Sequence, residues 1–193
     1  VVGSTAFNAG TTAIDCTAVG FNALGANQTG AGAVAIGKDA LAASTAAGNT
    51  AVGTGALDAN VAGVRNVAVG LDAGGAAAGA NDNDNTFIGH NAGLLANGSA
   101  SGGNTAVGAN ALDAAVTSID ATAVGFNALT ASTANGNTAV GARCLDANVA
   151  GLRNVAMGED AGGAQAGAND NDNTFVGYHA GILANASASG GNV

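Results

Sequence analysis

Two copies of an oxygen-rich tract, Asn-Asp-Asn-Asp-Asn, occupy residues 81–85 and 169–173. Carboxylate and amide oxygens are the ligands that a hard cation such as Ca²⁺ prefers. The tract lacks the glycine and the terminal glutamate of an EF-hand loop, so the alternative is a hydrated turn held by Asx hydrogen bonds. The sequence therefore offers a weak candidate Ca²⁺ site with four carboxylates, Asp82, Asp84, Asp170 and Asp172.

Three tripeptides match the acceptor pattern for N-glycosylation, with Asn27, Asn97 and Asn185 as the acceptor residues. This pattern arises often by chance in a chain that is rich in Asn. It predicts modification only if the chain lies outside the cell.

Catalysis requires a positioned acid, base or nucleophile, and the sequence shows no recurring cluster of that kind. His90 and His179 lie in columns that vary between repeats, which indicates a solvated or partner-facing surface.

Cys16 and Cys144 are about seven coils apart in the repeat pattern described below, too far to form a disulfide within one chain. Cys144 occupies a column of alanines, so we expect it to be a small buried side chain, whereas Cys16 is either free or joins chains laterally. We expect no enzyme and no catalytic residue, and no cofactor other than the candidate Ca²⁺.

Composition narrows the class of protein further. The 193 residues include 50 Ala and 33 Gly, so a core of bulky side chains is excluded and order must come from regular repetition. Four basic residues and a net charge of −9 exclude a nucleic-acid binder, which needs cations to neutralise phosphates. No apolar run approaches the roughly 18 residues of a membrane helix, so we expect no membrane insertion.

The phrase Asn-Thr/Val-Ala-Val-Gly recurs along the whole chain, and its glycines are 16 to 19 residues apart. A period of this length, with β-branched residues before each glycine, is typical of a stacked β-structure. Residues 49–104 and 137–192 also match at 44 of 56 positions, which reveals a longer repeat. We predict one continuous all-β domain over 1–193, a parallel β-solenoid or β-roll of about 11 coils, with super-repeats 1–105 and 106–193.

The columns of the aligned phrases predict how each coil is built. The apolar residue before each glycine is expected to point inward, and the glycine to form the corner between two short strands. The Asn four residues before the glycine is expected to stack into an amide ladder. The alanine between the two β-branched residues would then point outward, together with Phe87 and Phe175, and form an apolar stripe for assembly.

These phrases resemble the head repeats of trimeric autotransporter adhesins, with similar repeats in phage tail-fibre shafts. The resemblance rests on residues 17–24, their copy at 122–129, and residues 85–89, and it extends over the whole chain. The resemblance implies a left-handed parallel β-roll, often trimeric, exposed at the cell surface or on a virion as a rod that binds surfaces. The coils of 16 to 19 residues are longer than the adhesin repeat.

The two ends of the sequence continue one another. Asn192 and Val193 begin the phrase that Val1, Val2 and Gly3 complete, and neither end carries a polar cap. We therefore expect these residues to join end to end, either within a longer chain or between protomers that add strands to one another.

The sequence thus predicts a structural segment of a self-assembling extracellular fibre, whose main partner is another copy of itself. One alternative is an adhesin head or phage fibre shaft that contacts a cell surface or a glycan. A less favoured alternative is an ice-binding protein, because columns of Thr order water but Val replaces several of them.

Overall fold

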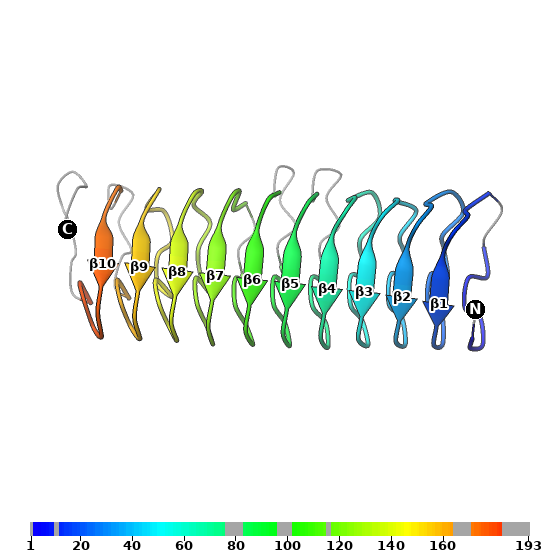
Figure 1. The fold of residues 1–193 in the computed structure, drawn as a ribbon, viewed down its shortest axis with the longest axis horizontal. Coiled ribbons are helices and arrows are strands. Elements are labelled where there is room, and N and C mark those ends of the chain that lie inside the picture. The colour runs from blue at the N-terminus through cyan, green and yellow to red at the C-terminus, as the bar shows by residue number, and fades with distance from the viewer. Residues whose placement is uncertain are drawn as a thin grey trace.

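The structure is a computed structural model that describes residues 2–9, 12–75, 83–95, 102–114, 117–163 and 171–182. These residues form a straight rod of stacked coils, each contributing one three-residue strand (Figure 1). The strands are β1 (Thr17–Val19), β2 (Val34–Ile36), β3 (Thr50–Val52), β4 (Val67–Val69), β5 (Thr86–Ile88), β6 (Thr105–Val107), β7 (Thr122–Val124), β8 (Thr138–Val140), β9 (Val155–Met157) and β10 (Thr174–Val176).

All ten strands belong to one parallel sheet, in the order β1 to β10. Each strand pairs in register with its sequence neighbours, so that Ala51 of β3 lies beside Ala35 of β2 and Ala68 of β4. Val2 continues the ladder before β1 through a bridge to Val19. The prediction of an all-β parallel solenoid is confirmed, and the sheet runs without interruption through both super-repeats.

The orientation of the strand residues is opposite to the sequence-based prediction. The middle residue of each strand is buried, as Ala18, Ala51 and Phe87 show with no exposed surface. The β-branched residues on either side of it point outward and are half-buried or exposed. The reason is that a coil of 16 to 19 residues encloses a narrow interior, which admits the small alanine side chain while Val and Thr remain on the outside.

The second strand of each predicted pair is also absent among the described residues, because the chain forms consecutive turns after each glycine. In the first of these turns, Ala23 N donates to Gly20 O and Gly25 N donates to Asn22 O. Asn22 and Leu24 have φ values of 54° and 52°, and these turns direct the leucine side chain into the interior. The same leucine position is fully buried in six coils, at Leu24, Leu41, Leu57, Leu112, Leu129 and Leu145.

The glycine that ends each strand is required by its backbone. Gly53 has a φ of 142°, and a Cβ atom there would collide with the carbonyl oxygen of Gly70 in the next coil. The equivalent glycines share this geometry, with φ between 129° and 142°. A residue with a side chain would force adjacent coils apart, which explains why this column contains glycine throughout the chain.

The asparagine ladder is present as predicted. Asn49 Oδ1 accepts a hydrogen bond from Asn66 N at 2.9 Å, and Asn66 Oδ1 accepts one from Asn85 N at 2.9 Å. The amide of Asn49 also donates to Gly63 O at 2.8 Å, so the side chain binds two backbone groups of the next coil. These asparagines are fully buried, and their bonds satisfy polar groups that no water reaches.

Candidate functional site: the outer face of the sheet

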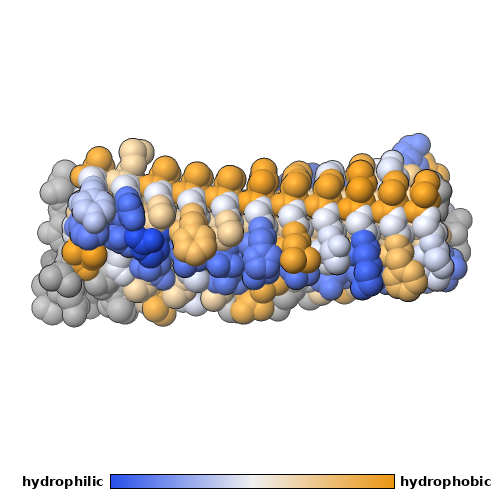
Figure 2. Space-filling view, turned by 90° about the horizontal axis from the view of Figure 1, so that it is seen from below, coloured by the Kyte–Doolittle hydropathy of each residue, from blue (hydrophilic) through white to orange (hydrophobic). Residues whose placement is uncertain are grey.

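The outward residues of the ten strands form a continuous face along one side of the rod. All twenty positions are occupied by Val, Thr, Ile or Met, and none carries a charge. The residue before the glycine is exposed in six of the ten strands, for example at 40% for Ile88, 51% for Met157 and 67% for Val176, and is half-buried in the other four. Figure 2 shows this column as an unbroken apolar row beside the paler row of glycines. We call this surface the outer face.

The outer face owes its regularity to the backbone. Every strand has the same length and the same register, so equivalent side chains repeat at the strand spacing of about 4.8 Å. Three strand residues span about 10 Å, and ten strands extend over about 48 Å, which corresponds to a footprint of about 480 Å². Thirteen of the twenty positions are Val, Ile or Met and seven are Thr, so the face is uncharged and mostly apolar. A contiguous apolar surface of several hundred Å² usually marks an interaction site.

The predicted assembly stripe of Phe87 and Phe175 is wrong, because both side chains lie inside the rod, at 0% and 6% exposure. The apolar surface instead consists of the residues that flank them, such as Ile88 and Val176. Of the predicted assembly residues at the ends, Val2 is 65% exposed, and Gly3 has the geometry of the other strand-ending glycines. Val1, Asn192 and Val193 lie outside the described residues.

The carboxylates of the candidate Ca²⁺ site form ion pairs where the structure describes them. Asp84 receives two hydrogen bonds from the Arg65 guanidinium, at 2.6 and 2.7 Å, which hold the pKa of that carboxyl below its usual range. Asp172 is paired in the same way with Arg153. Asp82 and Asp170 lie outside the described residues, and within the described ranges no three acidic, His or Cys side chains gather as a metal site would need. The arrangement of Asp84 and Asp172 favours an inter-coil ion pair over a cation site.

The acceptor amide of Asn27 is not accessible in the folded chain. Its side chain is fully buried, its Oδ1 accepts from Gly30 N at 2.8 Å and its Nδ2 donates to Gly30 O at 2.8 Å. This turn is incompatible with a glycan at Asn27 in the folded protein. Asn97 and Asn185 lie outside the described residues.

The two cysteines are free. Cys144 is fully buried, as the alanine column predicts, and burial raises the pKa of its thiol to about 11. Cys16 is partly buried, with its Sγ 3.2 Å from Gly30 O. A protonated, buried thiol is a poor nucleophile, so Cys144 contributes to packing and not to chemistry.

His179 belongs to a charged cluster on the turns that follow the strands. Arg143 binds Asp160 through Nε at 2.7 Å and Glu159 through Nη2 at 2.6 Å, and His179 Nε2 lies 3.2 Å from Asp160. Arg143 holds the pKa of the Asp160 carboxyl low, with a smaller contribution from His179. In the sequence, the positions of Arg143, Glu159 and His179 differ between the two super-repeats, and this variability indicated a surface.

Comparison with known proteins identifies no relative: no family model, no curated protein and no solved structure matches this chain. Among the described residues, no helix has the length and hydropathy needed to cross a membrane.

Proposed function

We propose that this chain is a structural segment of an extracellular fibre, in which copies pack side by side through the outer face. The observation that carries this proposal is the uncharged, mostly apolar surface that runs along all ten strands. Such a surface is costly to leave in water, and burying it on an equivalent surface removes apolar area from both copies. The resemblance to adhesin and tail-fibre repeats supports the location outside the cell.

The size of the outer face predicts how strong this association is. Two footprints of about 480 Å² bury about 1,000 Å² in total, which is near the lower limit for a specific interface. A single unit of this length therefore associates weakly. Because each added coil adds the same area, a longer stack associates more strongly, as a fibre requires.

End-to-end growth extends the same ladder. Each strand between β1 and β10 donates and accepts backbone bonds with the coil on either side, as Thr50 N does with Asn66 O at 2.8 Å. A further coil with the same phrase can pair with an edge strand by the same bonds, because a solenoid edge presents free donors and acceptors.

Sedimentation analysis of two charged variants tests the side-by-side contact. We expect the wild-type chain to form oligomers as its concentration rises, and Val69→Lys with Ile88→Lys to remain monomeric, because each lysine places a charge in the interface. The matched control is Val61→Lys with Val149→Lys, at similarly exposed positions outside the sheet. A wild-type chain that stays monomeric at every concentration, or outer-face variants that associate like the wild type, would contradict the proposal.

Ice binding is a second candidate, and one observation favours it. The Thr column faces outward, so hydroxyl and methyl groups repeat on a flat and rigid surface, and Val keeps the same branched shape where it replaces Thr. This candidate predicts that a monomeric chain retards ice growth and that Val69→Lys with Ile88→Lys abolishes the effect. A thermal-hysteresis measurement on the monomer separates it from the fibre proposal.

A further inference from the structure

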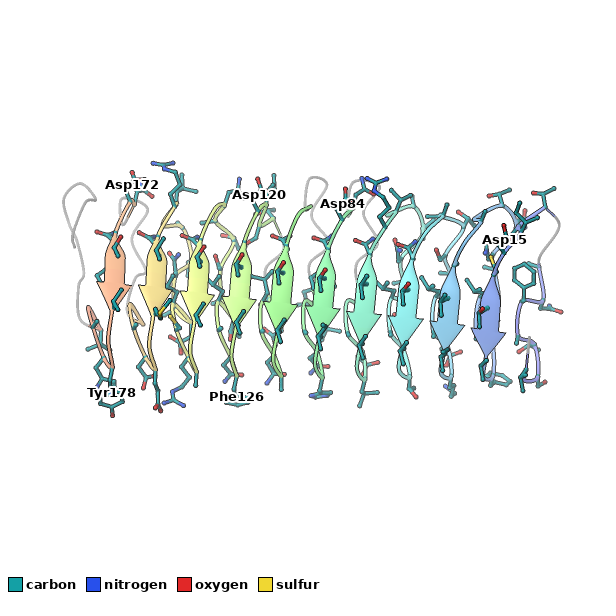
Figure 3. The ribbon with its side chains drawn as sticks, viewed as in Figure 1. Asp15, Asp84, Asp120, Phe126, Asp172 and Tyr178 are labelled. Atoms are coloured by element: carbon teal, nitrogen blue, oxygen red, sulfur yellow. The ribbon has the colours of Figure 1, made fainter. Side chains whose placement is uncertain are left out.

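The turns after the strands carry a second surface, which is distinct from the outer face. The first residue after the strand-ending glycine is large, apolar and exposed in four coils: Phe21 at 52%, Leu71 at 47%, Phe126 at 51% and Tyr178 at 70%. Figure 3 shows Phe126 and Tyr178 projecting from the same lower edge of the rod. We call this line of four residues the turn ridge.

The turn ridge has a regular spacing. Its residues follow β1, β4, β7 and β10, which are three coils apart, or about 14 Å at the strand spacing of a sheet. The positions between them contain small or polar residues, which are, in chain order, Lys38, Thr54, His90, Ala109, Ala142 and Glu159. Figure 2 shows apolar and hydrophilic side chains interspersed along this edge of the rod.

A row of hydrogen-bonding side chains lies next to the turn ridge, one residue further along the turn in every coil except that of β3, where Gly55 stands. Asn22 Nδ2 donates to Asp39 Oδ1 at 2.9 Å, and Asn110 Nδ2 donates to Asn127 Oδ1 at 3.1 Å. These contacts between coils hold the amides and carboxylates in place. Their remaining donors and acceptors are available at the surface, because the side chains are only partly buried.

The aromatic ring at the end of the ridge is also held in place. The rings of Tyr178 and His179 are stacked with centroids 3.8 Å apart and an interplanar angle of 20°. His179 in turn contacts Asp160, which Arg143 binds. Tyr178 therefore presents a flat platform whose orientation is supported by three coils.

From this geometry we infer that the turn ridge binds a neutral, extended β-linked polysaccharide along the axis of the rod. The C–H face of a pyranose ring packs on an aromatic face, whose π-electrons attract the C–H groups, and the sugar hydroxyls bond to amides and carboxylates. One sugar of an extended chain advances by nearly the rise of one coil, so every third sugar meets an apolar platform. Four weak contacts to one polymer act together, so the affinity of the whole chain exceeds that of any single contact.

The charge and shape of the surface disfavour other partners. The net charge of −9 repels polyanions such as nucleic acids and acidic glycans. The apolar residues form a single interrupted line, which is too narrow to provide the area of a specific protein interface. A linear neutral polymer is the partner that contacts widely spaced platforms without needing a broad surface.

Retention on insoluble polysaccharides tests this inference, with microcrystalline cellulose, chitin and insoluble xylan as the probes. We expect the wild-type chain to be retained on at least one of them, and the triple variant Phe21→Ala, Phe126→Ala and Tyr178→Ala to bind at least tenfold more weakly. The matched control replaces three other exposed apolar residues, Ile14→Ala, Val61→Ala and Val149→Ala, and should bind as the wild type does. Leu71→Trp should strengthen binding, because it adds a fourth aromatic platform.

Two results would overturn the inference: no retention of the wild type on any of the three polymers, or equal retention of the wild type and the ridge variant. Circular dichroism confirms that each variant is folded, and all substituted side chains are exposed, so loss of the fold is not expected. The inference does not depend on the fibre proposal. The Val69→Lys and Ile88→Lys variant, which leaves the ridge intact, should bind the polysaccharide as the wild type does even if the outer face proves to have no role.

Discussion

The coils around β3 and β5 fill the same interior in two different ways. In the coil of β3, Ala51 and Leu57 are both fully buried and supply the core. In the coil of β5, Phe87 replaces the alanine, and Gly93 replaces the leucine. We call these the Leu-filled and the Phe-filled coils; the second super-repeat has the same exchange at Phe175 and Gly181.

The comparison shows that the interior of a coil is filled either from the strand side, by a phenyl ring, or from the turn side, by a leucine. A Cβ atom at Gly93 would collide with the Phe87 ring, and one at Gly74 in the preceding coil would lie 2.7 Å from Phe87 Cδ2. The phenyl ring thus occupies the space that leucines occupy elsewhere. Leu57 has a φ of 51° and Gly93 a φ of 62°, so the backbone is similar in both kinds of coil and accepts leucine when the ring is absent.

The largest predicted effect comes from reversing this exchange. Phe87→Ala should destabilise the fold by about 3–5 kcal/mol, because it leaves a cavity in a closely packed interior. Gly93→Leu alone should also destabilise it, since the new side chain overlaps the ring. The double variant should recover part of the loss, because it converts a Phe-filled coil into a Leu-filled one. Denaturant unfolding of the four proteins measures this coupling.

If the double variant is less stable than either single variant, the interiors of the two kinds of coil are not interchangeable. The exposed substitution Val61→Ala serves as a control and should change stability by about 0.5 kcal/mol or less.

A smaller effect is expected from the asparagine ladder, which passes through both kinds of coil. Asn85→Ala removes the acceptor of Asn104 N and the side-chain contact with Asn66, and leaves buried polar groups unsatisfied. We expect a loss of about 1–3 kcal/mol, measured by thermal or denaturant unfolding. Asn8→Ala, at an exposed position, should be nearly neutral. Equal stability of the two variants would mean that the ladder does not hold the coils together.

The smallest effect is expected from the exposed ion pair of Arg65 and Asp84, which lies on the coils of β4 and β5. The pKa of Asp84 is lowered by Arg65, so the pair contributes stability above the unfolded pKa of the carboxyl and loses it as pH falls through the folded pKa. The melting temperature of the wild type should slightly exceed that of Arg65→Ala at neutral pH, and the difference should vanish in acid and in high salt. A difference that persists in acid would assign the effect of Arg65 to packing.

Much of the architecture follows from the sequence. The glycines at intervals of 16 to 19 residues predict the coil, because close approach of adjacent backbones excludes a side chain there. The asparagine column predicts the ladder, because stacked coils place equivalent amides next to one another. Both predictions depend on the repeats, because equivalent residues in successive coils show the same structural position many times.

The direction of the strand residues could not be predicted in the same way. A three-residue strand such as Thr50–Val52 has no longer alternation to reveal its buried side, and the rule that large apolar residues lie inside favours Val52 over Ala51. That rule fails here because the interior is narrow and is also filled from the opposite side by leucines such as Leu57. The reversed strand orientation also misplaced the predicted surface. Phe87 was expected outside the rod, and the residues of the outer face were expected inside it.

The period, the stacking and the parallel sheet can be read from the amino-acid sequence, because they depend on residues that recur at fixed intervals. Which side of each strand meets water depends on how much space the turns leave within a coil, so it is visible only in the folded molecule. The outer face follows from that decision, whereas the turn ridge lies on the turns, where the variable columns of the sequence already indicated a surface.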